Sequence, residues 1–282
     1  MTMIGMVGLG QMGGAMMRRL REQGQAVAGF DLNPALRDAA RQAGAIACAT
    51  PAGVAAPLVV FSLPHAAAVE AVLDAVLPHL APGAIIADTS TLEPGAARAF
   101  ARRADGAGVA YLDAPVSGGP AGAAAGTLAM MVGGSGAALG RARPGLLLLA
   151  TRIVHVGESG AGQVAKLANN LLVATHLAAA AEALRMAAAA GVPPEAILPV
   201  INAASGRSAA TEVNWPRWIA SGSFDSGFTA GLMRKDLRLA LALAADAGAV
   251  LAVCAAAADA WEVSDVPDNA EFNNVPAKIF AS

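Results

Sequence analysis

The strongest constraint on the fold is a change in the hydrophobic pattern near Gly157. Before this residue, short apolar runs alternate with alanine-rich stretches that favour helices. Strands that alternate with helices predict a parallel sheet with helices on both faces, so the expected fold class of this part is doubly wound α/β. The predicted strands are residues 3–7, 26–30, 58–63, 84–88, 110–116, 128–132 and 152–156.

The strand pattern does not continue beyond this point. Residues 162–190 are typical of one long helix, which Gly191 and the prolines that follow it bring to an end. Further helices are expected at 194–203, 232–247 and 249–263. We therefore expect two domains, an α/β domain at residues 1–160 and an all-helical domain at residues 161–282, joined by the long helix.

The composition does not indicate a membrane protein. Hydrophobic residues make up 56% of the 282 residues and charged residues only 14%, but a membrane-spanning helix needs about 20 mainly apolar residues. The best candidate, residues 239–261, is interrupted by Asp246, Gly248 and Asp259. A secretory signal is not expected either, because the apolar segment 3–17 precedes its positive charges instead of following them.

Charge and cysteine content narrow the classes of function further. The net charge is −2, with 19 basic and 21 acidic residues and no basic run, so no nucleic-acid partner is expected. Cys48 and Cys254 are far apart in sequence and predict neither a disulfide framework nor a metal site. The four histidines show no metal-ligand spacing, so no metal is expected. The expected location is cytoplasmic.

A glycine-rich motif directly follows the first predicted strand. Residues 8–13 read Gly-Leu-Gly-Gln-Met-Gly, which matches G-x-G-x-x-G, and a helix is expected from about Gly13. Glycines in such a turn let the backbone approach a pyrophosphate, and the free N–H groups at a helix start attract this anion. A strand–helix turn without a ligand is the alternative. We expect a Rossmann domain whose cofactor contacts include Gly8, Leu9, Gly10, Gln11, Met12 and Gly13.

Asp31 follows the second predicted strand, 18 residues beyond the last glycine of the motif. An acidic residue at this offset hydrogen-bonds the ribose hydroxyls of NAD and repels the additional phosphate of NADP. The next residues, Leu32, Asn33 and Pro34, include no arginine, which favours NAD and leaves NADP as the second candidate. The alternative is that Asp31 caps the next helix, although Asn33 could perform that task instead.

Three further segments carry polar residues where a ligand is expected, namely residues 88–91, 113–119 and 160–170. Ligands of open α/β sheets bind beyond the carboxyl ends of the strands, where the first two segments lie. Lys166 and Asn170 are four residues apart and therefore share one face of the long helix. Beside the Ser117 hydroxyl, Gly118 and Gly119 can offer backbone N–H groups to a carboxylate.

In these motifs the chain resembles the β-hydroxyacid dehydrogenases, the family that includes 3-hydroxyisobutyrate dehydrogenase and tartronate semialdehyde reductase. The resemblance covers nearly the whole chain through four ordered motifs, residues 8–13, 113–119, 160–170 and 228–237. It implies that Lys166 is the catalytic acid/base and that the family's usual homodimer or homotetramer forms. It further implies substrate and catalytic contacts from Asn170, Ser117, Gly118 and Gly119, and a cofactor site lined by Leu63, Pro64, Thr91 and Lys235.

The expected reaction is the NAD-dependent oxidation of a small β-hydroxy acid, similar to 3-hydroxyisobutyrate, to its semialdehyde, or the reverse reduction. A lysine takes the hydroxyl proton only where burial or positive charge lowers its pKa. Only three of the 19 basic residues are lysines, Lys166, Lys235 and Lys278, so we expect lysine where its chemistry is required. The alternatives are a surface cation at Lys166 and a solvated face at Lys235, next to Arg234, Asp236 and Arg238.

The C-terminal part departs from the family pattern. Many members end with an Asp-x-Ser-Ala-like segment, whereas residues 268–274 read Asp-Asn-Ala-Glu-Phe-Asn-Asn, which leaves the substrate open among 3-hydroxyisobutyrate, L-serine and glycerate. The alternative functions are reduction of tartronate semialdehyde or a related semialdehyde, imine reduction, and NAD binding without catalysis. Imine reductases usually lack a lysine at position 166, and a binding protein has little reason to keep Lys166, Asn170 and Ser117 together.

Overall fold

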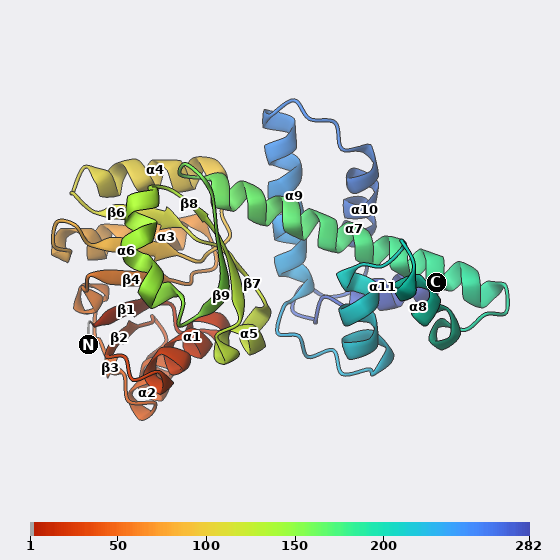
Figure 1. Ribbon diagram of the computed structural model, residues 1–282, viewed down its shortest axis with the longest axis horizontal. Coiled ribbons are helices and arrows are strands. Elements are labelled where there is room, and N and C mark those ends of the chain that lie inside the picture. The colour runs from red at the N-terminus through yellow and green to blue at the C-terminus, as the bar shows by residue number, and fades with distance from the viewer. Residues whose placement is uncertain (1–2) are drawn as a thin grey trace. The chain divides into compact units, whose positions relative to one another are not determined.

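A computed structural model describes residues 3–282. The chain divides into two compact units between Lys166 and Leu167, six residues beyond the expected boundary at residue 160 (Figure 1). The first unit contains all the strands of the sheet, and the second unit is built from helices. The expected fold class is confirmed.

The first unit is built on a nine-stranded sheet. Its order is β3-β2-β1-β4-β5-β6-β8-β7, and β9 pairs with β8. Strands β1 to β6 are parallel, whereas β8 is antiparallel to β6 and β7 and parallel to β9. The strands are β1 (Ile4–Val7), β2 (Val27–Phe30), β3 (Ile46–Ala47), β4 (Leu58–Phe61), β5 (Ile85–Asp88), β6 (Ala110–Asp113), β7 (Val116–Ser117), β8 (Leu128–Gly133) and β9 (Ala150–Gly157).

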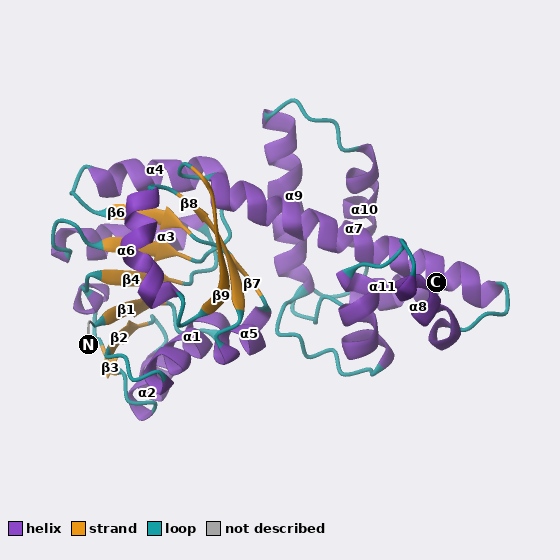
Figure 2. Cartoon of the chain, viewed as in Figure 1, coloured by secondary structure: helices purple, strands orange, loops and turns teal. Residues whose placement is uncertain are grey.

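Helices cover both faces of this sheet (Figure 2). Along β4, Leu58 and Val60 pack in one hydrophobic core with residues of α1 and α6, while Val59 and Phe61 pack in a second core with α3 and α4. Burial on both faces explains why the central strands are continuous apolar runs. The helices are α1 (Gln11–Glu22), α2 (Pro34–Gln42), α3 (Ala66–Val76), α4 (Pro94–Asp105), α5 (Gly119–Ala125) and α6 (Gly136–Leu146), with 3₁₀ turns at Pro51–Val54 and Leu77–His79.

The predicted strand at residues 110–116 is interrupted in the structure. Strand β6 ends at Asp113, and β7 begins at Val116 as an antiparallel partner of β8. Pro115 lies between them, and proline has no N–H group to donate to a parallel neighbour. The break therefore turns the segment that follows toward a different strand.

The second unit is all-helical, as expected. Helix α7 (Ala161–Ala189) begins in the first unit, and Gly191, with φ of +85°, follows its end. The core contains Leu167 and Leu177 of α7, and Trp261 donates its indole N–H to the carbonyl oxygen of Ala174 at 3.1 Å. The other helices are α8 (Pro194–Ala203), the π-helical segment Ala210–Ala220, α9 (Ala230–Asp246), α10 (Ala252–Glu262) and α11 (Asn274–Ala281).

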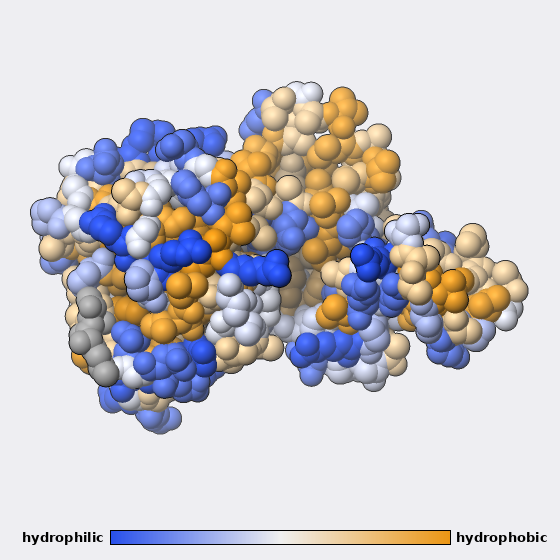
Figure 3. Space-filling view, in the orientation of Figure 1, coloured by the Kyte–Doolittle hydropathy of each residue, from blue (hydrophilic) through white to orange (hydrophobic). Residues whose placement is uncertain are grey.

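Two apolar features of the second unit were not expected. Helix α7, rather than residues 239–261, is long and apolar enough to cross a membrane by length and composition, and 44% of its most apolar 18-residue window is buried in the structure. Hydrophobic residues also gather over α9 and α10 (Figure 3). Val250, Val253 and Val263 are each at least 75% exposed there.

Candidate functional site

The glycine motif forms the turn between β1 and α1, and its glycines have different reasons to be glycine. Gly8 has φ of +85°, and a Cβ atom there would lie 2.1 Å from the carbonyl oxygen of Ser62. A Cβ atom on Gly13 would lie 1.8 Å from the carbonyl oxygen of Gly8. At Gly10, by contrast, a Cβ atom would meet nothing within 4 Å. The protein's own packing therefore requires glycine at positions 8 and 13. It does not require glycine at position 10, which a bound ligand would explain.

The start of α1 offers free N–H groups at the same place. Gly10 precedes the helix, no side chain caps it, and no acidic residue lies in its first turn. Gly10 and Gln11 are exposed. An uncapped helix N-terminus attracts an anion through its N–H groups and its positive dipole end. The motif therefore fits the pyrophosphate of a dinucleotide.

Asp31 joins the end of β2 to the glycine motif. Its Oδ2 accepts a hydrogen bond from the backbone N–H of Leu9 at 2.8 Å, and its Oδ1 accepts one from the N–H of Asn33 at 2.8 Å. Helix α2 is capped by Asn33, whose side-chain oxygen accepts from the N–H of Ala35 at 3.0 Å. The alternative in which Asp31 caps α2 is therefore wrong.

The backbone of Asp31 is in contact with an arginine. Nη1 of Arg37, in the first turns of α2, donates to the carbonyl oxygens of Asp31 at 2.6 Å and Leu32 at 3.1 Å. Its guanidinium carbon is 5.8 Å from the centroid of the Phe30 ring. Positive charge is therefore present at the end of β2 although residues 32–34 include no arginine, because the side chain of Arg37 in α2 lies there.

Helix α7 starts at the end of β6 and packs against β8. Asp113, buried at the end of β6, accepts hydrogen bonds from the backbone N–H groups of Gly160 at 2.8 Å and Gln163 at 3.0 Å. These are N–H groups that a helix start leaves without intrahelical partners. A Cβ atom on Gly162 would lie 2.5 Å from the carbonyl oxygens of both Asp113 and Met131. Asp113 therefore fixes the first turn of the helix that carries Lys166.

The side chain of Gln163 connects this turn to the loop that contains Thr91. Its Oε1 accepts from the N–H of Leu92 at 2.9 Å, and its Nε2 donates to the carbonyl oxygen of Ser90 at 2.9 Å. The hydroxyl oxygen of Ser90 in turn accepts from the N–H of Leu63 at 2.9 Å. Two predicted cofactor residues, Leu63 and Thr91, are thus brought to one edge of the sheet, with Pro64 exposed beside them.

Lys166 and Asn170 are both buried in the structure, with exposed fractions of 8% and 5%. The alternative of a surface cation at Lys166 is therefore wrong. The side-chain oxygen of Asn170 accepts from Nδ2 of Asn169 at 3.1 Å, and its own Nδ2 donates to Oδ2 of Asp236 at 2.6 Å. These two bonds set the orientation of the Asn170 amide.

The residues around Lys235 do not form the solvated face that their charges suggested. Asp236 is 2% exposed, and Arg234 is buried while donating to the carbonyl oxygens of Trp261 and Ser264 and to Asp268. Lys235 is partly buried, with Nζ 3.2 Å from Oδ1 of Asp236. A signal was present in the sequence, because residue 236 has helical spacing to the apolar residues at 233 and 240. Arg238 is exposed and pairs with Glu262.

The segment Ser117–Gly119 connects β7 to α5. Ser117 is half-buried and Gly118 is exposed. The backbone is left-handed at both glycines, with φ of +127° at Gly118 and +63° at Gly119. Glycine adopts this region without the steric cost that a side chain imposes. The segment therefore leaves bare backbone next to a hydroxyl, as a carboxylate-binding turn requires.

The unusual C-terminal segment 268–274 has a structural explanation in the second unit. The side chain of Asn273 is fully buried, where its Nδ2 donates to Oε1 of Glu271 at 2.8 Å and its Oδ1 accepts from Asn214 at 3.0 Å. Asn274 donates to the carbonyl oxygen of Glu271 at 2.8 Å. These two carboxamides therefore satisfy polar groups within this unit.

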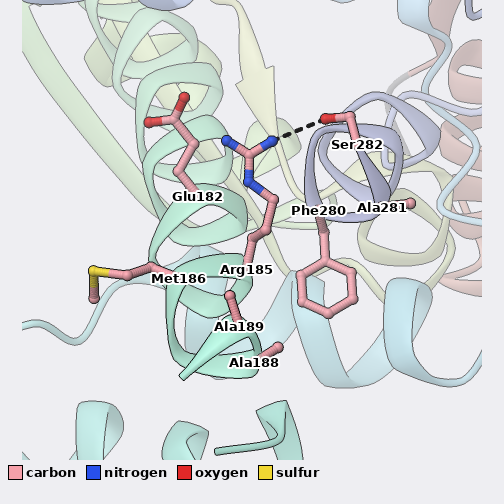
Figure 4. A pocket seen from close by; sticks show the side chains of 8 residues that line it. All are labelled: Glu182, Arg185, Met186, Ala188, Ala189, Phe280, Ala281 and Ser282. Carbon is pink, nitrogen blue, oxygen red and sulfur yellow. Dashed lines mark hydrogen bonds between the residues drawn. The ribbon is translucent and has the colours of Figure 1, made fainter. Parts of the chain in front are cut away.

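A cavity of about 590 Å³ lies between the C-terminal half of α7 and α11 (Figure 4). Arg185 reaches across it to the Ser282 hydroxyl, at 3.0 Å. No predicted site residue lines it, and its first lining residue, Glu182, lies 12 residues after Asn170, about 18 Å along the helix. The cavity is therefore separate from the candidate site. Within residues 3–282, no three His, Cys, Asp or Glu side chains are grouped as a metal site.

Asp88 gives the first unit a defined pH response. Burial raises the pKa of this carboxyl above its ordinary value of 3.8, although hydrogen bonds from Ser90 and Tyr111 oppose the shift. The carboxyl therefore binds its proton more tightly in the folded state than in the unfolded chain. As pH rises above about 4, the contribution of this group to the free energy of unfolding is lost. We expect the Tm of Asp88→Asn to rise relative to wild type between about pH 4 and pH 7, measured by circular dichroism.

The exposed Asp246→Asn provides the control for this pH series and is expected to follow wild type throughout. A constant difference in Tm between Asp88→Asn and wild type across the series would contradict the interpretation.

Two family models match the chain. Residues 3–157 match the NAD binding domain of 6-phosphogluconate dehydrogenase, and residues 160–271 match the model described as NAD-binding of NADP-dependent 3-hydroxyisobutyrate dehydrogenase. The first match covers most of the unit that contains the glycine motif, and the second covers α7 and the helices that follow it as far as α10.

Several known proteins are similar over most of their length. The chain is 40% identical to 2-(hydroxymethyl)glutarate dehydrogenase of Eubacterium barkeri, covering 92% of this chain and 88% of that one. It is 41% identical to NAD-dependent L-serine dehydrogenase of Pseudomonas aeruginosa, covering 85% and 84%. The structure of Mycobacterium tuberculosis 3-hydroxyisobutyrate dehydrogenase with L-serine superposes with a TM-score of 0.92 at 37% identity and covers 99% of both chains.

Proposed function

Because the chain belongs to the β-hydroxyacid dehydrogenase family, whose members oxidise the hydroxyl group of hydroxy acids with NAD(P), we propose that Lys166 is its general acid/base. The observation that carries this proposal is the position of Lys166. It is a buried lysine in the second turn of a helix whose start is fixed by Asp113 to the end of β6 and by Gln163 to the loop after β5. A buried amine in such a place has a fixed position, which proton transfer requires.

In the oxidation, neutral Nζ of Lys166 takes the proton of the substrate hydroxyl as the C–O bond becomes a carbonyl. NAD, when bound, supplies the acceptor for the hydride that leaves the same carbon. In the reverse reduction, the ammonium group of Lys166 returns the proton to the developing alkoxide. Arginine cannot replace it, because its guanidinium group does not lose a proton in proteins.

The substrate proposed here is a small carboxylate with a β-hydroxyl group, similar to 3-hydroxyisobutyrate. Ser117 and the bare backbone of Gly118 and Gly119 provide hydrogen-bond donors for its carboxylate. Asn170 provides a further donor, because its amide nitrogen carries two N–H bonds and Asp236 accepts one of them. Relatives named for 2-(hydroxymethyl)glutarate and L-serine support this substrate class.

The cofactor site proposed for NAD consists of residues 8–13, Asp31, Leu63, Pro64, Thr91 and Lys235. Of these, Gly10 gives the clearest test, because it has free space where a side chain would be. We expect Gly10→Ala to raise the Kd for NAD at least 10-fold by titration calorimetry while leaving Tm nearly unchanged. Gly140→Ala in α6 is the matched control, since a Cβ atom there also meets nothing within 4 Å. Unchanged NAD binding in Gly10→Ala would contradict the assignment.

The preference between NAD and NADP depends on two groups at the end of β2. The carboxylate of Asp31 favours the ribose hydroxyls of NAD, whereas the guanidinium group of Arg37 attracts the phosphate of NADP. We propose NAD as the preferred cofactor, with measurable activity on NADP.

The function is tested by following absorbance at 340 nm with 3-hydroxyisobutyrate, L-serine, glycerate and 2-(hydroxymethyl)glutarate, each with NAD and with NADP. Tartronate semialdehyde and a cyclic imine are tested in the same way with NADH and with NADPH. NADH formation with at least one of these acids is expected. Activity confined to the reduction of tartronate semialdehyde would favour the alternative reductase, and activity only on imines would favour the imine reductase. NAD binding without turnover of any compound would identify a binding protein.

We also propose a cytoplasmic homodimer or homotetramer that acts on a small molecule rather than on nucleic acid or at a membrane. The exposed valines of the α9–α10 region, which includes Val250 and Val253, support self-association, because monomeric proteins rarely expose contiguous apolar patches. Light scattering measures the oligomer, and a monomer at micromolar concentration would contradict this part of the proposal.

A further inference from the structure

Gln163 occupies an unusual position for a polar side chain. It is fully buried in the first turn of α7, and both ends of its amide are hydrogen-bonded to the backbone of one loop. Its partners, Ser90 and Leu92, are the residues before and after Thr91. The side chain thus pairs with the loop as a peptide group of a neighbouring strand would.

This connection extends in two directions within the first unit. On one side, the Ser90 hydroxyl accepts from the N–H of Leu63, so the loop after β5 is joined to the loop after β4. On the other side, Gln163 lies three residues before Lys166, less than one helical turn away. Both loops carry proposed cofactor residues, and the helix carries the proposed acid/base.

The first turn of α7 has little freedom to adjust if this connection is lost. Gly162 packs against the carbonyl oxygens of Asp113 and Met131 with no room for a Cβ atom. The backbone N–H of Gln163 is held by Asp113. The helix start is therefore fixed to β6 and β8, and the side chain of Gln163 joins it to the loop that contains Thr91.

From this geometry we infer that Gln163 is a positioning residue that sets the placement of Lys166 relative to the cofactor loop. The inference rests on the proposed function, since it assigns Gln163 to the proton and hydride transfer step. A displacement of about 1 Å between reacting groups lowers a rate by about 100-fold. Loss of the two side-chain bonds is therefore expected to reduce kcat, while the glycine motif and Asp31 maintain NAD affinity.

Gln163→Met removes both bonds and retains the length of the side chain. We expect kcat to fall 10- to 100-fold, the Kd for NAD to stay within twofold of wild type, and the deuterium isotope effect with substrate labelled at the hydroxyl-bearing carbon to increase. Gln163→Glu is the second variant, because a carboxylate can still accept from Leu92 but cannot donate to Ser90. Gln42→Met, at the exposed end of α2, is the matched control and is expected to behave as wild type.

Combination with Lys166→Ala separates positioning from a general structural role. If Gln163 acts through Lys166, Gln163→Met lowers the residual activity of Lys166→Ala by less than threefold, because the group to be positioned is gone. A full additional 10- to 100-fold loss in the double variant would overturn the inference. Unchanged kcat in both Gln163→Met and Gln163→Glu would also overturn it. A wild-type protein that turns over no β-hydroxy acid would overturn the proposed function and this inference with it.

Discussion

Lys166→Ala is expected to lower kcat for β-hydroxy acid oxidation by about 10²- to 10⁴-fold, the usual contribution of general acid–base catalysis. The variant has no group at this position to take the hydroxyl proton. Lys166→Arg is expected to lose nearly as much activity, because arginine keeps the positive charge but cannot act as a base. NADH formation at 340 nm gives kcat, and titration calorimetry gives the Kd for NAD, which is expected to remain close to wild type in both variants.

Lys278→Ala is the control for this experiment. Lys278 is also one of only three lysines, but its side chain is 53% exposed and pairs with Asp265 at the surface of α11. It is expected to leave kcat unchanged. Equal activity of wild type, Lys166→Ala and Lys166→Arg would rule out the role assigned to Lys166.

Asp236→Ala is expected to have the second largest effect, lowering kcat/KM about 100-fold. The carboxylate orients the Asn170 amide through a 2.6 Å hydrogen bond and faces the Lys235 ammonium group at 3.2 Å. Its removal leaves the buried amide of Asn170 without this acceptor, at a cost of about 1–3 kcal/mol in the free energy of unfolding. Steady-state kinetics and urea denaturation measure the two effects.

Asp236→Asn separates the two contacts of this carboxylate. The asparagine oxygen can still accept from Asn170, but the negative charge beside Lys235 is lost. If orientation of Asn170 is the main role, Asp236→Asn retains most of the activity that Asp236→Ala loses. Equal losses in both variants would instead assign the effect to Lys235. Asp246→Ala, at the exposed C-terminal end of the same helix, is the control.

Local patterns were sufficient to predict much of the fold. The predicted helix at residues 194–203 has the same bounds as α8, because a proline starts it and its pattern needs no distant partner. The glycine motif predicted the turn between β1 and α1 for a similar reason, since its steric requirements come from nearby backbone. The mixed edge of the sheet was not predicted, because the pairing of β7 with β8 depends on a turn after Pro115.

The candidate site was predictable where one motif carries the chemistry, and less so where distant residues meet. The family resemblance pointed to Lys166 and Asn170, and their helical spacing predicted that they share one face of the long helix. Asp236 received no role from the sequence, since its charged neighbours left a solvated face open as the alternative at Lys235, yet it bonds to a residue 66 positions away. Gln163 and Leu92 are 71 positions apart, and no local pattern reports such a contact.

The function of Lys166 is tested most directly by the pH dependence of kcat, measured from about pH 6 to pH 10 for wild type and Lys166→Ala. We predict that wild-type kcat for oxidation rises with pH through one ionisation, as the amine becomes neutral and able to accept the hydroxyl proton. In Lys166→Ala this ionisation is expected to be absent while NAD still binds. If Lys166→Ala shows the same ionisation with the same amplitude as wild type, another group transfers the proton and Lys166 is not the general acid/base.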